Sequence, residues 1–316
     1  MAQTIALSNG HLMPIFGLGT WQAKQAQPDQ VRLACVEAIK AGYRLIDTAA
    51  AYQNENEVGQ AVKECIAAGI IKRSDIFITT KCFITTLHPD KVEPALRGSL
   101  ERLGMDFVDL YLAHMPVAFN PDFTQDPSVS VEMTWKALES VYKKGLTRAI
   151  GVSNYSIDQI ERVMKIAEVP IHNQQVELHL YFPQFEMASA CLKHNISLTS
   201  YSTLGNPSRM EYKTPDGRPN PFFEAPADLD DAYVKELAKK YNKSPAQILL
   251  RYCIERNIAV IPKSVTPSRV RENFQVFDFK LTADEMGKLR KPAHTIRLYP
   301  QDFMKGHPED FLKHER

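Results

Sequence analysis

The feature that most constrains the fold is a regular alternation of short apolar runs with longer amphipathic stretches. Runs typical of β-strands occur eight times, near residues 16–19, 44–47, 76–80, 107–113, 148–152, 171–176, 196–200 and 258–261. The stretches between them carry apolar residues at helical spacing. Because parallel strands need long crossover connections, this alternation predicts a parallel sheet covered by helices.

Eight such units in 316 residues fit a closed (β/α)8 TIM barrel. The main competitor is a doubly wound open sheet. Its phosphate fingerprint is missing, because Gly17-Leu-Gly19-Thr-Trp21 has no third glycine at the required spacing and no Walker sequence occurs. We therefore predict one α/β barrel domain over residues 1–316, with an N-terminal β-hairpin at Ser8-Asn9-Gly10 and long C-terminal loops.

Three helix starts are explicit in the sequence. Ser156 with Gln159 and Thr282 with Glu285 match the capping box, and Ser244-Pro245-Ala-Gln247 adds a proline at the first helical position. These motifs predict helices that begin directly after each serine or threonine.

Composition excludes several classes of partner. The 38 basic and 37 acidic residues give a net charge of +1, which argues against nucleic acid or an anionic membrane as the main partner. No apolar run approaches the roughly 20 residues of a membrane span, and the first residues lack the features of a signal peptide. Five scattered cysteines form no Cys-x-x-Cys pair, as expected in a reducing compartment. We expect a cytoplasmic monomer.

Polar residues with catalytic potential follow three of the predicted strands. Asp47 closes one strand and Tyr52 follows five residues later, while Lys81 and His114 end the next two strands. In a barrel the loops after the carboxyl ends of the strands build the active site, so these side chains are expected to converge. The nine histidines include no His-x-His pair, which makes a metal-dependent hydrolase an unfavoured alternative, and we expect no metal.

The group can be interpreted as a proton donor with its supports. A free tyrosine has a pKa of about 10 and is a weak acid, so a neighbouring cation is expected to lower the pKa of Tyr52. Lys81 would supply that charge and Asp47 would hold the ammonium group. His114 could donate to a substrate oxygen and orient it. Each residue taken alone is more often structural.

Three motifs carry a family resemblance along nearly the whole chain. They are Gly42-Tyr-Arg-Leu-Ile-Asp47-Thr-Ala with Glu55 and Val58-Gly59, then Gly151-Val-Ser-Asn-Tyr155, and finally Ile261-Pro-Lys-Ser264. In these motifs the sequence resembles the aldo-keto reductases of the aldose and aldehyde reductase type. The resemblance implies hydride transfer from a nicotinamide to an aldehyde or ketone, with Tyr52 as the general acid, Lys81 and Asp47 tuning it, and His114 orienting the carbonyl.

The resemblance also implies a set of residues that hold NADPH or NADP+. Ser153, Asn154 and Gln175 match positions that bind the carboxamide, and Tyr201 matches the ring on which the nicotinamide stacks. The remaining expected cofactor contacts are Gly19, Thr20, Trp21, Asp47, Ser202, Leu204, Lys263, Ser264, Val265, Thr266, Arg269, Glu272 and Asn273. A strand-to-helix turn and simple core packing are the structural alternatives for Ser153-Asn154 and Tyr201.

The preference for a 2′-phosphate has a physical basis in the segment after the last strand. Thr266-Pro267 can start a short helix whose free N–H groups attract a phosphate, and Lys263 and Arg269 add positive charge. The alternative is a solvated basic turn.

The expected substrate wall is mostly apolar and favours hydrophobic aldehydes or ketones over sugars. Met115 follows His114, where aldose-reducing members usually carry tryptophan, and Ser208 replaces an acidic residue that in many members faces the equivalent of Lys263. Residues 206–231 are expected to form a lid, with disorder as the alternative, and residues 291–316 a further substrate-facing loop. The wall is expected to contain Trp21, Ala51, Tyr52, Phe83, His114, Met115, Phe119 and Phe123.

A third class of function keeps the fold and the cofactor but not the catalysis. Such a chain would be a redox-sensing or structural subunit, as some relatives are. The complete set of Asp47, Tyr52, Lys81 and His114 argues against it, because a binding protein has no need of a tuned acid.

Overall fold

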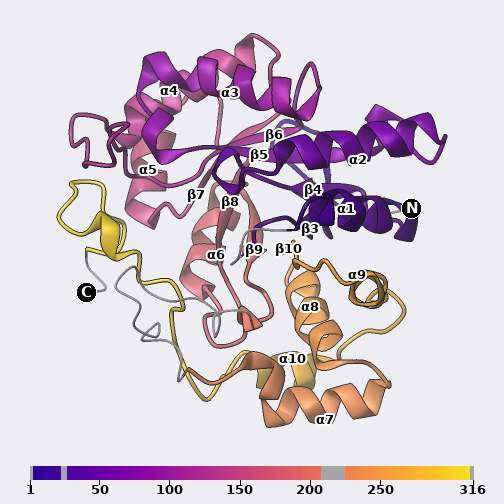
Figure 1. The fold of residues 1–316 in the computed structure, drawn as a ribbon. Coiled ribbons are helices and arrows are strands. Elements are labelled where there is room, and N and C mark those ends of the chain that lie inside the picture. Colours follow the sequence, from indigo (N-terminus) through magenta and orange to yellow (C-terminus); the bar gives the residue numbers. More distant parts are fainter. Residues whose placement is uncertain (1–2, 23–26, 208–224, 314–316) are drawn as a thin grey trace.

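The computed structural model describes residues 3–22, 27–207 and 225–313. Two short antiparallel strands come first, and eight parallel strands follow (Figure 1). The strands are β1 (Thr4–Ala6), β2 (Leu12–Pro14), β3 (Leu18–Gly19), β4 (Leu45–Asp47), β5 (Phe77–Cys82), β6 (Leu110–Ala113), β7 (Ile150–Ser153), β8 (Asn173–Glu177), β9 (Ser197–Tyr201) and β10 (Ala259–Val260).

The eight parallel strands form a barrel in chain order. Each strand from β3 to β10 pairs with its sequence neighbour. The first and last strands also meet, because Phe16 bridges Val260 and Gly19 bridges Lys263 in parallel register. The predicted (β/α)8 barrel is therefore confirmed, and all eight strands lie where the apolar runs indicated.

Helices connect the strands and surround them (Figure 1). They are α1 (Gln30–Ala41), α2 (Glu55–Ala67), α3 (Pro89–Leu103), α4 (Val131–Lys143), α5 (Ile157–Ile166), α6 (Phe185–Lys193), α7 (Ala232–Tyr241), α8 (Pro245–Glu255), α9 (Pro267–Phe274) and α10 (Ala283–Leu289), with 3-10 turns η1 (Ala50–Tyr52), η2 (Arg73–Asp75), η3 (Ile84–Thr86), η6 (Asp228–Asp230) and η7 (Asp302–Met304). In the described part of the connection from β9 to β10, the α-helices are α7 and α8.

The three predicted helix starts are confirmed as capping boxes. Ser156 accepts a hydrogen bond from Gln159 N, Ser244 from Gln247 N and Thr282 from Glu285 N, and each glutamine or glutamate accepts in return from the capping residue. These reciprocal bonds satisfy N–H groups that have no partner within the helix.

The N-terminal hairpin is present, and its turn lies at the predicted Ser8-Asn9-Gly10. Gly10 N donates to Leu7 O and Leu7 N donates to His11 O. Among the turn residues only Gly10 has a positive φ, of 85°. Asn9 therefore does not adopt the left-handed conformation that a two-residue Asn-Gly turn would require, and the loop has three residues with Gly10 in a bulge.

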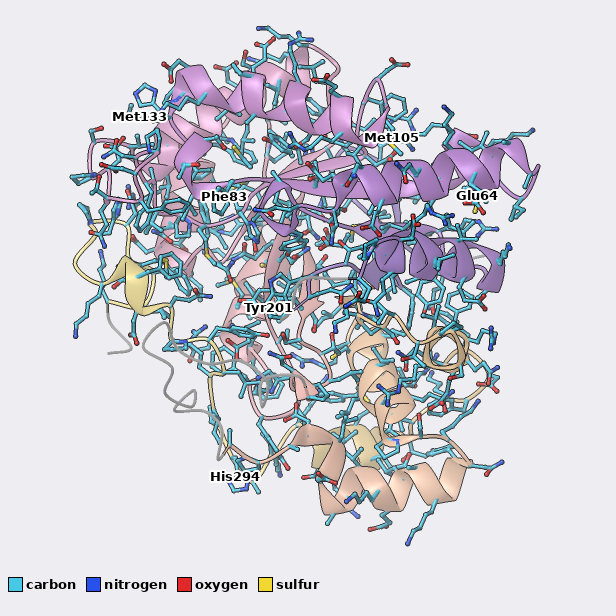
Figure 2. The ribbon with its side chains drawn as sticks, viewed as in Figure 1. Glu64, Phe83, Met105, Met133, Tyr201 and His294 are labelled. Carbon is cyan, nitrogen blue, oxygen red and sulfur yellow. The ribbon has the colours of Figure 1, made fainter. Side chains whose placement is uncertain are left out.

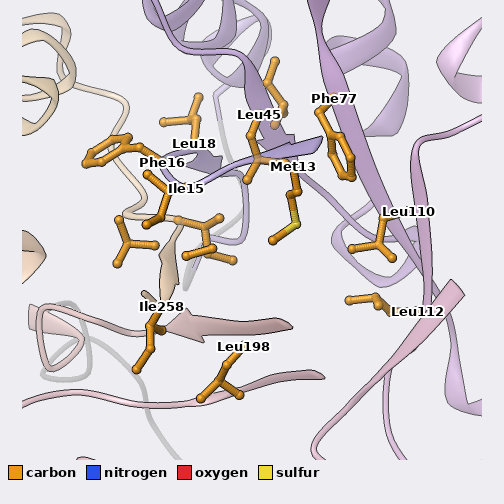
Figure 3. Close-up of a cluster of buried hydrophobic side chains, with 14 of the residues drawn as sticks. Met13, Ile15, Phe16, Leu18, Leu45, Phe77, Leu110, Leu112, Leu198 and Ile258 are labelled. Carbon is orange, nitrogen blue, oxygen red and sulfur yellow. The ribbon is translucent and has the colours of Figure 1, made fainter. Parts of the chain in front are cut away.

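The hairpin covers the amino ends of the barrel strands. Met13 and Ile15 are buried among side chains of the strands (Figure 3). Asn9 Nδ2 donates to Arg148 O, just before β7, over 2.9 Å. This arrangement leaves the carboxyl ends of the strands as the end where a site can form.

The C-terminal segment after α10 returns across the molecule to α5, as the yellow trace in Figure 1 shows. Gln159 Nε2 donates to Glu309 O over 3.0 Å, and Arg162 forms an ion pair with Glu309 at 2.8 Å. Of the proposed lid, residues 208–224 and with them Ser208 lie outside the described residues. Its last residues form η6 and the cap of α7, where Asp231 accepts from Tyr233 N and Val234 N.

Candidate active site

The four candidate catalytic residues lie at the carboxyl ends of three neighbouring strands. Asp47 is the last residue of β4, Lys81 is the fifth residue of β5, and His114 directly follows β6. Tyr52 ends η1, the 3-10 turn that follows β4. Because β4, β5 and β6 pair in parallel, the barrel brings together the residues that the sequence had separated.

Lys81 is the centre of this group. Its side chain is fully buried, and Nζ donates to Asp47 Oδ1 at 2.5 Å and to Thr48 O at 3.0 Å. Nζ also lies 3.4 Å from the Tyr52 hydroxyl. The Tyr52 and His114 rings meet edge to face with centroids 5.6 Å apart. One ammonium group thus joins a carboxylate to a phenol.

The electrostatic environment of Tyr52 differs from the expected one. Burial raises the pKa of the Tyr52 hydroxyl above its ordinary value, and the nearby Lys81 charge opposes this shift without overcoming it. The negative charge of Asp47 raises the same pKa further. Lys81 therefore lowers the pKa of Tyr52 as expected, but the loss of solvent on burial has the larger effect, so the net pKa is raised.

Lys81 and His114 have well-defined charge states. Burial alone would lower the pKa of the Lys81 ammonium, but Asp47 and Tyr52 outweigh it and raise the pKa, so Lys81 is protonated. Burial, together with the charge of Lys81, lowers the pKa of His114 to about 3. His114 is therefore a neutral imidazole near pH 7.

A buried polar network that sequence reasoning missed supports Asp47. Asn54 Nδ2 donates to Thr20 O at 2.9 Å, and Asn54 Oδ1 accepts from Thr48 Oγ1 at 3.1 Å. Thr20 Oγ1 donates to Asp47 O at 3.0 Å. Thr48 stood in the first sequence motif without an assigned role, and no sequence signal singled out Asn54, because both act through contacts between β3 and the loop after β4.

Gln175 and Asp47 connect the catalytic group to the opposite strands. Gln175 Nε2 donates to Asp47 Oδ2 at 2.8 Å, across the barrel from β8 to β4. The Gln175 carbonyl accepts from Ser153 Oγ at 2.8 Å. Asp47 thus contacts both Lys81 and a residue expected to hold the cofactor.

Asn154 and Tyr201 form a second group at the carboxyl ends of the barrel strands. Asn154 has a positive φ of 64°. Its Nδ2 donates to His114 O at 3.0 Å, and its Oδ1 accepts from the Tyr201 hydroxyl at 2.7 Å. Tyr201 is half-buried near the centre of the molecule, below Phe83 in the view of Figure 2. The hydrogen bond to Asn154 fixes one end of the ring.

The other expected cofactor residues lie along the same end of the barrel. Gly19 lies between Asp47 of β4 and Lys263 after β10 in the register of the barrel. Trp21 and Leu204 are half-buried. The Ser202 hydroxyl lies 2.7 Å from the hydroxyl of Tyr299 in the C-terminal segment.

The segment after β10 has the predicted form. Thr266 precedes α9, which has proline at its first position, and no side chain caps its first N–H groups. Lys263, Thr266, Arg269 and Glu272 are exposed, whereas Ser264 and Asn273 are buried and Val265 is half-buried. Cationic side chains therefore surround an uncapped helix start that faces solvent.

The expected substrate wall is an aromatic cluster joined to the C-terminal segment. Phe83 and Met115 pack on a buried group that includes Phe119 and Met304. Phe119 is 7% exposed, so it supports the wall from behind. Phe123 is 62% exposed, with its ring centroid 6.2 Å from that of Phe83. Ala51 is half-buried in the turn before Tyr52.

Neither a metal-binding cluster nor a membrane-spanning helix occurs in the part of the chain that the structure describes. Within residues 3–22, 27–207 and 225–313, no group of three or more His, Cys, Asp or Glu side chains is arranged to hold a metal ion. In those same ranges no helix has the length and apolar character to cross a membrane.

Comparisons with known proteins agree with this geometry. The model of the Aldo/keto reductase family matches residues 16–293. Aldo-keto reductase family 1 member A1 of Gallus gallus is 44% identical, with 96% of this chain and 95% of that protein aligned. Aldo-keto reductase family 1 member A1-A of Danio rerio is 45% identical, over 90% and 88% of the two chains.

Solved structures give the same result. A Bombyx mori aldo-keto reductase in complex with NADP superimposes with a TM-score of 0.89 at 36% identity, covering 98% of each chain. The aldose reductase of Schistosoma japonicum gives a TM-score of 0.88 at 34% identity, covering 99% of this chain and 100% of that one. The chain therefore belongs to the aldo-keto reductase family.

Proposed function

We propose that this protein is an NADPH-dependent reductase that converts aldehydes or ketones to alcohols, with Tyr52 as the proton donor. The observation that carries the proposal is the buried Lys81 ammonium, which contacts Asp47 at 2.5 Å and the Tyr52 hydroxyl at 3.4 Å. A phenol beside a buried cation at the open end of a barrel has the chemistry of a general acid.

The shifted pKa values support a division of roles. Because burial raises the pKa of Tyr52, the hydroxyl keeps its proton at neutral pH and has one to donate. After donation the tyrosinate would lie beside the Lys81 ammonium, whose charge stabilises it. Lys81 thus acts mainly on the product of the proton transfer, which lowers the barrier without ionising Tyr52 beforehand.

His114 is assigned to orienting the carbonyl. Because burial and the Lys81 charge lower the pKa of His114 to about 3, the imidazole carries no extra proton at pH 7. A neutral ring still has one N–H, which can donate to the carbonyl oxygen. With its ring against that of Tyr52, His114 would hold this oxygen close to the phenol.

The residues present fit a nicotinamide cofactor. Ser153, Asn154 and Gln175 place hydroxyl and amide groups at neighbouring strand ends, and Tyr201 supplies a flat ring fixed by its hydrogen bond to Asn154. The Bombyx mori relative was solved with NADP. When bound, the reduced nicotinamide would supply the hydride for the carbonyl carbon.

The phosphate end of the cofactor fits the start of α9. Uncapped N–H groups and the exposed Lys263 and Arg269 side chains favour an anion there. We assign the 2′-phosphate of NADPH to this helix start, with Glu272 and Asn273 near the adenine. The aromatic wall of Phe83, Met115 and Phe123 favours hydrophobic carbonyl substrates over sugars.

We also propose that the chain works as a cytoplasmic monomer with a single domain. All five cysteines are buried and form no disulfide, which suits a reducing compartment. A mass of about 36 kDa by light scattering would support the monomer, since the sequence mass is 35.8 kDa, and twice that mass would contradict it.

A carbonyl screen tests the proposed activity. Short-chain, aromatic and sugar aldehydes would be offered with NADPH and, separately, with NADH. The proposal predicts the highest kcat/KM for aromatic aldehydes with NADPH. If no aldehyde oxidised bound NADPH in a single turnover, the protein would be a cofactor-binding protein without reductase activity.

A further inference from the structure

Beyond the proposed catalytic group, a second buried cluster of charges lies at the end of β8. Glu177 and His179 follow Gln175 at alternate positions along the chain. Asp228 joins them from η6. All three are buried, with His179, Glu177 and Asp228 each 1% exposed. Buried charges need partners, so each contact of this cluster has an energetic consequence.

His179 lies between the two carboxylates. Its Nε2 is 3.1 Å from Glu177 Oε1, and its Nδ1 is 3.0 Å from Asp228 Oδ2. Asp228 Oδ2 also accepts from Leu180 N at 3.1 Å. A protonated imidazole in this place neutralises part of the charge of two carboxylates and joins η6 to the end of β8.

Glu177 in turn holds the C-terminal segment. Its Oε1 accepts from Leu298 N at 2.5 Å and its Oε2 accepts from Tyr299 N at 3.2 Å. Arg297 lies 4.0 Å from Oε2. Ile296 N donates to Tyr181 O over 2.8 Å, two residues past His179. The segment is therefore fixed to the end of β8 through its backbone.

The anchored segment reaches Ser202 and Tyr201, two residues that are assigned to the cofactor. The Tyr299 hydroxyl is 2.7 Å from Ser202 Oγ, and the Tyr299 ring meets the Tyr201 ring edge to face at 5.7 Å. Tyr299 thus connects the buried cluster to two residues expected to contact the cofactor. A change at His179 would be transmitted through Glu177 and Tyr299 to those two residues.

We propose that His179 and Asp228 are positioning residues that slow the release of NADP+, by holding Glu177 where it anchors Tyr299 against Tyr201 and Ser202. The inference rests on the proposed function, which places the nicotinamide at Tyr201. Neither residue takes part in the hydride or proton transfer, because both lie outside the group of Lys81 contacts.

The charges around His179 make the anchor dependent on its proton. Glu177 of β8 and Asp228 of η6 contact its two ring nitrogens, Arg297 of the C-terminal segment lies near Glu177, and Asp231 is bonded to Tyr181. Burial alone would lower the pKa of His179, but the hydrogen bonds and charges of Asp228 and Glu177 raise it to about 9. Above that pH the two carboxylates lose the cation between them.

The test is the rate at which NADP+ dissociates from the full-length protein, followed by stopped-flow fluorescence. His179→Gln removes the cation, and Asp228→Asn removes one carboxylate with little change in shape. We expect release to be roughly tenfold faster in His179→Gln and a few-fold faster in Asp228→Asn, as for the loss of one or two hydrogen bonds to charged groups. Single-turnover hydride transfer should stay within about twofold of the parent, since a positioning residue acts on release and not on chemistry.

His172→Gln is the matched control. His172 is also a buried histidine, directly before β8, but it contacts Ile150 at the other end of the strand. The His172→Gln variant should release NADP+ at the same rate as the parent. Release should also accelerate in the parent as the pH passes about 9, and this step should be missing from His179→Gln.

Two results would overturn the inference. One is parent-like release from both His179→Gln and Asp228→Asn, or from Asp228→Asn alone if the other variant does not fold. The other is an identical pH profile of release in the parent and His179→Gln. Failure of the proposed function is a separate result, because a parent that binds NADP+ but reduces no aldehyde would still report the release rate.

Discussion

Lys81 is the residue on which the proposed site depends most. Its ammonium group has no exposure to solvent and has three oxygen partners, from Asp47, Thr48 and Tyr52. Removing one partner of a buried ion pair leaves the other charge uncompensated, which costs more free energy than the pair contributed. Stability and chemistry are therefore coupled at this position.

We expect Lys81→Met to lower the free energy of unfolding by about 3–5 kcal/mol, because Asp47 stays buried with Gln175 as its remaining side-chain partner. Carbonyl reduction should fall at least a hundredfold, since the tyrosinate would form without a cation beside it. Urea unfolding and single-turnover kinetics measure the two effects.

Lys143→Met is the control for that variant. Lys143 is 54% exposed and pairs with Glu168, which is 64% exposed, so its loss should change the unfolding free energy by less than about 1 kcal/mol. Equal destabilisation by the two substitutions would contradict the view that Lys81 compensates a buried charge.

At this scale the sequence could predict which residues meet but not their charge states. Asp47, Lys81 and His114 were recognised because parallel strands share one open end, and the contacts follow from that rule. The raised pKa of Tyr52 could not be predicted, since it depends on burial by residues distant in sequence. Asn54 and His179 were missed for the same reason.

At the scale of single elements, the start of α9 carries the assignment of the phosphate. We expect Arg269→Ala to weaken NADPH binding roughly 10- to 100-fold, as for a lost charge-assisted hydrogen bond, and to leave NADH nearly unchanged. Fluorescence titration with both nucleotides measures this difference.

Arg271→Ala is its matched control, because Arg271 lies on the same helix but pairs with Glu37. It should affect neither nucleotide. Equal weakening of NADPH and NADH by Arg269→Ala would place the 2′-phosphate elsewhere.

The cluster at the end of β8 predicts a pH dependence of stability. The pKa of His179 rises from about 6.5 in the unfolded chain to about 9 in the folded one. Because the folded state binds this proton more tightly, protonation of His179 stabilises it by on the order of 3 kcal/mol at pH values below the unfolded-state pKa. This contribution disappears as the pH rises through about 9.

The stability difference between the parent and His179→Gln should therefore be largest below pH 6.5 and should shrink towards pH 9. Urea unfolding at several pH values measures it. A difference that grows with pH would mean that His179 is neutral in the folded protein.

At the scale of the whole molecule, closure of the barrel depends on close packing between β3 and the segment after β10. A Cβ atom at Gly19 would lie 2.6 Å from Ile261 O, which is a backbone atom and cannot rotate away. Gly19→Ala should therefore lower the unfolding free energy by about 2–3 kcal/mol in the absence of cofactor.

Gly287→Ala, by contrast, is expected to stabilise the protein. Gly287 lies in α10, and a Cβ atom added there would have no described neighbour within 4 Å, so alanine should raise stability by roughly 0.5–1 kcal/mol through its helix propensity. Thermal unfolding of both variants makes the comparison. A neutral Gly19→Ala would show that the closure has room to relax.

The fold was more predictable from the sequence than the details of the site. Eight apolar runs indicated the barrel, and three capping motifs indicated the starts of α5, α8 and α10, because strand and helix signals are local in the sequence. Helix α7 was not predicted, since its cap Asp231 falls within the segment interpreted as a lid. The path of the C-terminal segment to α5 depends on contacts such as Arg162 with Glu309, 147 residues apart.

The most direct test of the central proposal is the single-turnover reduction of an aromatic aldehyde by the Tyr52→Phe variant with NADPH bound. The substitution removes one oxygen and keeps the ring against His114. We predict a rate roughly a thousandfold below the parent, with the dissociation constant for NADPH within about twofold. A rate close to that of the parent would contradict the proposal, because the proton would then come from His114 or water.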